Sequence, residues 1–256
     1  MEKLEHPLWI VQVVNRLLEP LIGRPVPDYL VMCALIVVFV AVLGLIVRSR
    51  LSVEHPGKLQ VLLEDALNGL RGLLQSFVGD KADRYVGIIG ALGIFILIGN
   101  YMGLVPGLKS PTSNINVTFG CALTIWVYYH IHGVKEQGLG PYLKHFAAPP
   151  GAPLFIAPIM LPIEIISHLS RVLSLSLRLY GNIFGEDLVI LILFSIVPLI
   201  VPLPMMFLGL ITGGLQAFIF VMLGTIYLGG AVATEHDHEP ADGQGHGHAP
   251  VPAESL

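Results

Sequence analysis

The chain has 256 residues, of which 54% are hydrophobic and 12% are charged, and its mean hydropathy is +0.75. This balance differs strongly from that of a soluble domain with a polar surface, so lipid must cover much of the molecule. The formal net charge of -4 and the scattered Lys and Arg residues give no electrostatic footprint for nucleic acid, which excludes that class of partner. Cys33 and Cys121 lie in apolar runs without CxxC spacing and are interpreted as small buried hydrophobic residues.

Long apolar segments predict membrane-spanning helices. A helix needs about 20 residues to cross a hydrocarbon core of about 30 Å, and residues 29–47 and 85–105 meet this length without a charge. Residues 116–131 are shorter, but their aromatic end suits the membrane interface, so they are predicted as a third span. The apolar stretch 154–232 divides at the prolines between residues 198 and 204, which predicts two long helices.

Residues 57–80 carry apolar side chains at helical spacing, with polar ones on the other face, which predicts an amphipathic helix along the membrane surface. The predicted fold is therefore an all-α integral membrane protein with five transmembrane helices, an amphipathic surface helix, and a hairpin of two long, strongly tilted C-terminal helices.

Three regions are expected along the chain. Residues 1–28 form a leader on the outer side, residues 29–232 form the membrane domain, and residues 233–256 form a disordered, His-rich tail with almost no large apolar residue. Basic residues concentrate between the first and second spans, which places that segment and the C-terminus in the cytoplasm and the N-terminus on the periplasmic or extracellular side. The tail histidines could bind a metal, but nothing near them would fix a geometry, so no metal is expected.

Polar residues concentrate in the segment LPIEIISHLSRVLSLSLRLYGNIFGEDL, residues 161–188. Such a helix, continuing to residue 197, would be about 50 Å long, so it must tilt strongly in the membrane and turn its polar face to protein or water. Asp187 points to a different surface from Arg178. At about 100° per residue, one broad face carries Glu164, Ser167, His168, Arg171, Ser174, Arg178, Asn182 and Glu186.

Arg178 has no carboxylate at i, i+4 in this segment, since the next one along the helix, Glu186, is eight positions away. No other predicted span carries a carboxylate at mid-depth, so we expect its counter-charge on a partner subunit. The alternative is that Glu164, Arg171 and Arg178 form structural ion pairs inside the helix bundle. Because ionisable groups at membrane depth are costly and commonly mark ion pathways, we favour a functional role.

Three separate motifs, SPTSNINVT, SLSLRLYGNIFGEDL and LQAFIFVMLGTIYL, resemble in sequence and order those of subunit a of F-type ATP synthases. The resemblance implies a non-catalytic stator subunit in a bacterial inner membrane, without a cofactor, whose two long helices wrap a rotating ring of c subunits. Further implied partners are the peripheral-stalk b subunits and the rest of the complex. It also implies that Arg178 is the essential arginine facing the ring, that Asn182 lies one turn on, and that Gln216 packs near it.

The implied mechanism agrees with the chemistry of arginine. A guanidinium stays protonated, so Arg178 can promote ionisation of an arriving ring carboxylate and block a direct leak between two offset half-channels, which couples proton flow to rotation and ATP synthesis. The predicted topology gives candidates for both half-channels: Asn116, Glu186, Asp187 and Gln216 for the outer one, and Glu164, Ser167, His168 and Arg171 for the inner one.

Two positions depart from the family pattern. Asn114 stands where many relatives carry an acid, so it cannot relay a proton by ionising, and Gly209 stands where relatives often carry histidine or an acid. Gly209 and Gly213 make a GxxxG spacing, which favours close helix packing over chemistry. An intramembrane hydrolase would need an HExxH or GxSxG motif, and neither occurs. A self-contained channel or transporter would need inverted repeats and an internal partner for Arg178.

Overall fold

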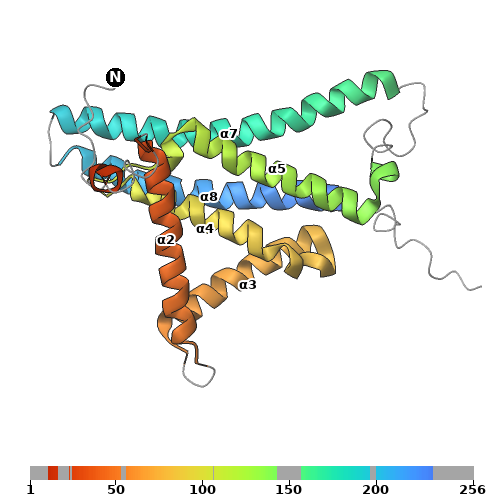
Figure 1. The fold of residues 1–256 in the computed structure, drawn as a ribbon, viewed down its shortest axis with the longest axis horizontal. Helices are drawn as coiled ribbons and strands as arrows, with labels where there is room; N and C mark the ends of the chain where they lie inside the picture. Colours follow the sequence, from red (N-terminus) through yellow and green to blue (C-terminus); the bar gives the residue numbers. More distant parts are fainter. Residues whose placement is uncertain are drawn as a thin grey trace, which may run out of the picture.

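The computed structural model describes residues 11–16, 23, 25–52, 56–105, 107–142, 157–196 and 200–232. Within these ranges every regular element is a helix, as predicted (Figure 1). The main helices are α2 (Asp28–Ser49), α3 (Lys58–Val78), α4 (Val86–Met102), α5 (Ile115–Gln137), α7 (Ala157–Ile196) and α8 (Pro202–Val232). Two short 3-10 helices, η1 (Gly79–Arg84) and η2 (Pro111–Ser113), precede α4 and α5.

The long helices share one direction. In Figure 1, α5, α7 and α8 run along the longest axis of the molecule, α4 packs against α8, and α2 stands across that axis. The helices α3 and α4 meet at η1 with a bend of 113°. The core between α4, α5, α7 and α8 is filled by buried apolar side chains such as Ile89, Ile125, Leu179 and Phe220.

The predicted amphipathic segment is the helix α3, whose buried residue Leu74 joins the core while Leu59 and Leu62 stay exposed. The predicted break between the two C-terminal helices is also confirmed, but α8 begins within the proline stretch, at Pro202, and includes Pro204. Proline is tolerated in the first turn of a helix because the backbone N–H groups there have no intrahelical partner.

Helix α5 continues beyond the predicted third span to Gln137. It ends at Gly138, whose φ of 83° lies in the left-handed region that favours glycine and closes the helix by an N–H bond to the carbonyl of Val134. In the part of the chain that the structure describes, three helices, α2, α7 and α8, are long and apolar enough to cross a membrane, and the bent pair of α3 and α4 makes a fourth if it is one span. The count of five spans stays a prediction.

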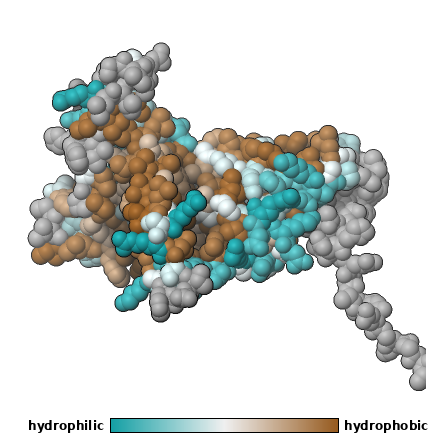
Figure 2. Space-filling model, turned by 60° about the horizontal axis from the view of Figure 1, so that its bottom comes forward, coloured by the Kyte–Doolittle hydropathy of each residue, from teal (hydrophilic) through white to brown (hydrophobic). Residues whose placement is uncertain are grey.

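The outer surface of the helices is largely apolar. Hydrophobic residues, brown in Figure 2, cover much of the face shown, and hydrophilic ones, teal, gather in separate areas. Val38 and Leu45 on α2, Ile166 on α7, and Phe207 and Leu215 on α8 are all exposed. Extended apolar surface of this kind is expected to contact lipid.

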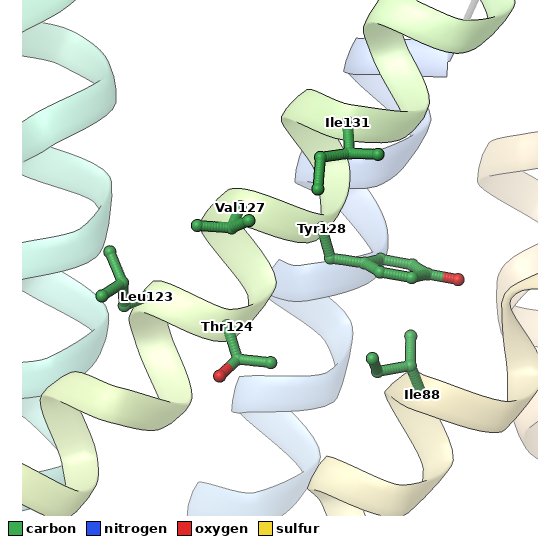
Figure 3. Close-up of a pocket in the computed structure, with 6 residues that line it drawn as sticks. All are labelled: Ile88, Leu123, Thr124, Val127, Tyr128 and Ile131. Carbon is green, nitrogen blue, oxygen red and sulfur yellow. The ribbon is translucent and has the colours of Figure 1, made fainter.

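One shallow groove on this surface lies between α4 and α5 (Figure 3). The hydroxyl of Thr124 donates to the carbonyl of Gly120 in its own helix at 2.8 Å, which leaves the groove mostly apolar and suited to lipid. Its lining residues are Ile88, Leu123, Thr124, Val127, Tyr128 and Ile131.

Candidate functional site

Arg178 lies on an exposed face of α7, together with Ser174 and Asn182. Its Nη2 is 3.5 Å from the hydroxyl of Ser174, and no salt bridge to Arg178 exists among the described residues. A guanidinium on a lipid-facing helix is costly without a counter-charge. The arrangement therefore presents a positive charge outward, without an acidic partner among the described residues.

Asn182 and Gln216 form the polar link between α7 and α8 beside Arg178. Nδ2 of Asn182 donates to Oε1 of Gln216 at 2.9 Å, and Gln216 is only 2% exposed. Nε2 of Gln216 has no hydrogen-bond partner within the described part of the chain. Buried amide N–H groups are rarely left unpaired, so this donor is an unusual feature of the α7–α8 contact.

Two acidic residues, Glu186 and Asp187, follow about one helical turn after Asn182. The hydroxyl of Thr212 on α8 donates to Oε2 of Glu186 at 3.2 Å. The other oxygen of Glu186 occupies the space beside Gly209, where a Cβ atom would lie 1.6 Å from it. The absent side chain at position 209 thus leaves room for the Glu186 carboxylate between α7 and α8.

Asp187 turns toward a different neighbour, as expected from its helical angle. It lies beside Ser113 and Lys109, and its Oδ1 would be 3.2 Å from a Cβ atom on Gly103. Glu186 therefore faces α8, and Asp187 faces the segment between α4 and α5.

A second polar cluster lies near the other end of α7. Oε1 of Glu164 is 3.2 Å from Nε2 of His168, and Nδ1 of His168 is 2.8 Å from the hydroxyl of Tyr129 on α5. The guanidinium of Arg171 lies over the ring of Tyr227, 5.2 Å from its centroid. Ser167 is half-buried on the same helix.

The polar stripe of α7 thus does not form one continuous surface. His168 is buried against α5, whereas Ser174 and Arg178 point outward, and Asn182 and Glu186 reach α8. The ideal helical wheel missed this division because the neighbours of α7 change along its length of 40 residues.

Asn116, a predicted member of the outer group, is exposed in the first turn of α5. Among the described residues no hydrogen bond joins its side chain to Glu186, Asp187 or Gln216. The side chain of Asn114 accepts the backbone N–H of Asn116 at 3.0 Å, so Asn114 is the N-cap of α5.

A buried hydrogen-bond network that the sequence reasoning did not assemble fixes η2 beside Asp187. Nδ2 of Asn100 donates to the carbonyl of Gly213 at 2.9 Å, and the hydroxyl of Thr112 donates to Oδ1 of Asn100 at 2.7 Å. The hydroxyl of Ser110 in turn donates to the carbonyl of Gly99 at 2.9 Å. Asn100 is the only strongly polar residue of its predicted span, and this was the sequence feature that could have indicated a buried polar contact. The close approach at Gly213 agrees with the predicted packing role of the GxxxG spacing.

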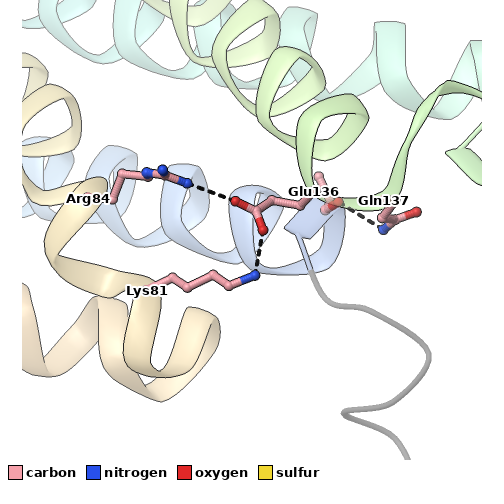
Figure 4. Close-up of polar contacts among 5 residues, drawn as sticks. Lys81, Arg84, Glu136 and Gln137 are labelled. Carbon is pink, nitrogen blue, oxygen red and sulfur yellow. Dashed lines mark hydrogen bonds and ion pairs between the residues drawn. The ribbon is translucent and has the colours of Figure 1, made fainter.

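A polar clamp ties together three helix ends away from the arginine (Figure 4). Glu136 near the end of α5 pairs with Lys81 and, at 2.9 Å, with Arg84, both in η1. The neighbouring Gln137 donates to the carbonyl of Ala231, near the end of α8, at 3.0 Å. The start of α4 and the ends of α5 and α8 are therefore held at one end of the bundle.

Within the described ranges no group of three or more His, Cys, Asp or Glu side chains could hold a metal ion. The tail histidines His236, His238, His246 and His248 and most of the predicted leader lie outside those ranges.

Comparison with known proteins gives a consistent result. The family model described as "ATP synthase A chain" matches residues 29–229. The chain is 40% identical over 232 residues to ATP synthase subunit a of Geobacter sulfurreducens, which covers 90% of this chain and 99% of that protein. The corresponding subunits of Geotalea uraniireducens and Citrifermentans bemidjiense are 40% and 41% identical over 90% and 91% of this chain, each with 99% of its own length covered.

Proposed function

Because the chain belongs to the ATP synthase A chain family, whose members are membrane subunits of the proton-translocating ATP synthase, we propose that Arg178 is the fixed charge of its proton path. The arginine faces the carboxylates of a rotating c-ring and separates two aqueous half-channels. The chain itself is non-catalytic, and ATP chemistry belongs to other subunits of the complex.

The observation that carries this proposal is the exposed guanidinium of Arg178, which has no ion-pair partner among the described residues. A carboxylate about 4 Å from it would gain on the order of 4 kcal/mol of Coulomb energy at an effective dielectric constant of about 20. That energy favours ionisation by about a factor of a thousand. A ring carboxylate therefore releases its proton as it reaches Arg178 and takes up another after leaving it.

The positions of the other polar residues support two separate half-channels. Glu164 lies 14 residues before Arg178 and Glu186 lies eight residues after it, distances of about 21 and 12 Å along a helix. The two polar clusters are thus on opposite sides of the arginine. We assign Glu186, Asp187, Gln216 and the more remote Asn116 to the outer half-channel. We assign Glu164, Ser167, His168 and Arg171 to the inner half-channel.

The clamp at Glu136 supports the count of five spans and their orientation. Because it holds the start of α4 and the end of α5 together, these two helices either both cross the membrane or both do not. The bond from Gln137 adds the end of α8 to the same side. With α2, α7 and α8 crossing, an α4–α5 hairpin gives five spans and puts the termini on opposite sides. The basic residues between α2 and α4 then place the N-terminus outside and the C-terminus in the cytoplasm.

The proposal is tested by ATP-driven acidification of inverted membrane vesicles that carry Arg178→Ala, with the amount of assembled complex measured in parallel. We expect normal assembly and no pumping. Leu177→Ala, which alters an exposed neighbour on α7 without removing a charge, is the matched control and should pump normally. Pumping at the native rate by an assembled Arg178→Ala complex would refute the proposal, and failure to copurify with c subunits would favour a self-contained channel.

A further inference from the structure

Three side chains of α5 and α7 form a continuous hydrogen-bonded row from the surface into the bundle. The Glu164 side chain is 32% exposed, the His168 side chain is 10% exposed, and Tyr129 is 1% exposed. The two contacts in the row are Glu164 Oε1 to His168 Nε2 at 3.2 Å and His168 Nδ1 to the Tyr129 hydroxyl at 2.8 Å. Only Glu164 and His168 belong to the polar stripe of α7, whereas Tyr129 comes from the neighbouring helix.

The direction of both hydrogen bonds depends on the tautomer of His168, and one arrangement satisfies all three groups while the ring is neutral and the carboxyl is ionised. An ionised carboxylate only accepts hydrogen bonds, so the contact with Glu164 requires the N–H of His168 at Nε2. In a neutral imidazole the other ring nitrogen, Nδ1, is then an acceptor. The Tyr129 hydroxyl therefore donates to Nδ1 and selects the ring tautomer that presents its N–H to Glu164.

We infer that Tyr129 is a positioning residue of the inner half-channel: its hydroxyl holds the His168 ring so that the Nε2–H donates to Oε1 of Glu164, and the carboxylate held in this way takes up and releases the proton through its other oxygen. This inference rests on the proposed function. The imidazole contributes a hydrogen bond and not a proton, so a ring rotated away from Glu164 would remove the contact that holds the carboxylate in the proton path. The other titratable or charged groups around His168 are Arg171 on α7, His130 on α5, whose ring centroid is 4.9 Å away, Tyr142 beside His130, and Tyr227 on α8.

The test compares Tyr129→Phe with Tyr128→Phe in the intact ATP synthase. Each change removes one hydroxyl from α5 and keeps the ring, but the Tyr128 side chain lies on the lipid-facing groove next to Ile88 (Figure 3). ATP-driven pumping by inverted vesicles is measured across external pH, which corresponds to the cytoplasmic side, and is normalised to assembled complex. Loss of one positioning hydrogen bond should slow pumping about three- to tenfold in Y129F. The pH at half-maximal rate should also shift in Y129F, and neither quantity should change in Y128F.

The same change made in a second variant, His168→Gln, tests whether Tyr129 acts through His168. In a His168→Gln chain, adding Y129F should have no further effect on the pumping rate, since the ring that it orients is gone. The same fold-loss in both backgrounds, equal behaviour of Y129F and Y128F, or a selective failure of Y129F to assemble would overturn the inference. These outcomes are separate from failure of the proposed function, which is read from pumping by Arg178→Ala.

Discussion

At the scale of single residues, the position of Glu186 in the proposed outer half-channel depends on the absence of a side chain at Gly209. Gly209 has no Cβ, and one oxygen of the Glu186 carboxylate fills the space that a side chain there would take. Thr212, one turn further along α8, donates to the other oxygen. The sequence identified Gly209 as a departure from its family. It could not predict that Glu186 fills the space beside Gly209, because this depends on how closely α7 and α8 approach.

Gly209→Ala should therefore displace the Glu186 carboxylate, because the new Cβ would lie 1.6 Å from Oε1. Loss of the bond from Thr212 should cost about 1 kcal/mol of stability. We also expect pumping to fall severalfold, because Glu186 belongs to the proposed outer half-channel. Thermal unfolding of the purified complex and vesicle acidification measure the two effects.

Two comparisons make this prediction specific. Gly230→Ala, on the same helix with no atom within 4 Å of its new Cβ, should be neutral. Adding Glu186→Asp to Gly209→Ala shortens the acid and should recover part of the pumping rate. No recovery would mean that Gly209 acts through another contact, such as that with Leu104 at 3.0 Å.

At the scale of helices, the clamp at Glu136 joins elements that are distant in sequence. The stability that it contributes depends on whether the Glu136 carboxyl is ionised. A hydrogen bond from Lys81, reinforced by the charges of Lys81 and Arg84, holds the pKa of Glu136 below its ordinary value of 4.5. Glu136 lies beyond the predicted span and is accessible to bulk pH. A depressed carboxyl pKa stabilises the folded state above the unfolded-state pKa, and this contribution is lost as pH falls through the lower, folded-state pKa.

Glu136→Gln should therefore destabilise the complex at neutral pH by less than about 1 kcal/mol, as is usual for partly exposed ion pairs. The difference from the native chain should shrink as pH falls below 4.5, where the native carboxyl also becomes neutral. Asp80→Asn, a nearby change in η1, is the control. Thermal midpoints measured across pH would contradict this interpretation if the difference between Glu136→Gln and the native chain did not depend on pH.

The helices themselves could be predicted from sequence where apolar spacing or run length is strong, as for α2 and α3. The third span was predicted to end at residue 131, beside His130 and His132, whereas α5 continues to Gln137 and ends at Gly138. The pairing of Tyr129 with His168 joins residues 39 apart in sequence. Such contacts depend on how α5 and α7 pack, and no periodicity within either segment encodes that.

At the scale of the whole molecule, the directions of the helices agree with strong tilt of α7. The 22 residues of α2 span about 33 Å, close to the thickness of a hydrocarbon core, so α2 can stand nearly upright. The 40 residues of α7 span about 60 Å, and this helix runs across the direction of α2 in Figure 1. If α2 follows the membrane normal, α7 and α8 lie strongly inclined and present a long side to a partner in the membrane.

This arrangement predicts the side of the membrane that each connection faces. In a chain whose Cys33 and Cys121 are replaced by Ala, single cysteines at Asp80, Lys109 and Leu139 bracket α4 and α5. We expect a membrane-impermeant maleimide to label positions 80 and 139 in inverted vesicles and position 109 in right-side-out ones. Helix α4 has only 17 residues, about 25 Å, so the crossing of this hairpin is the most demanding part of the topology. Labelling of positions 109 and 139 from the same side would mean that α5 does not cross, and the clamp at Glu136 would then require α4 not to cross either.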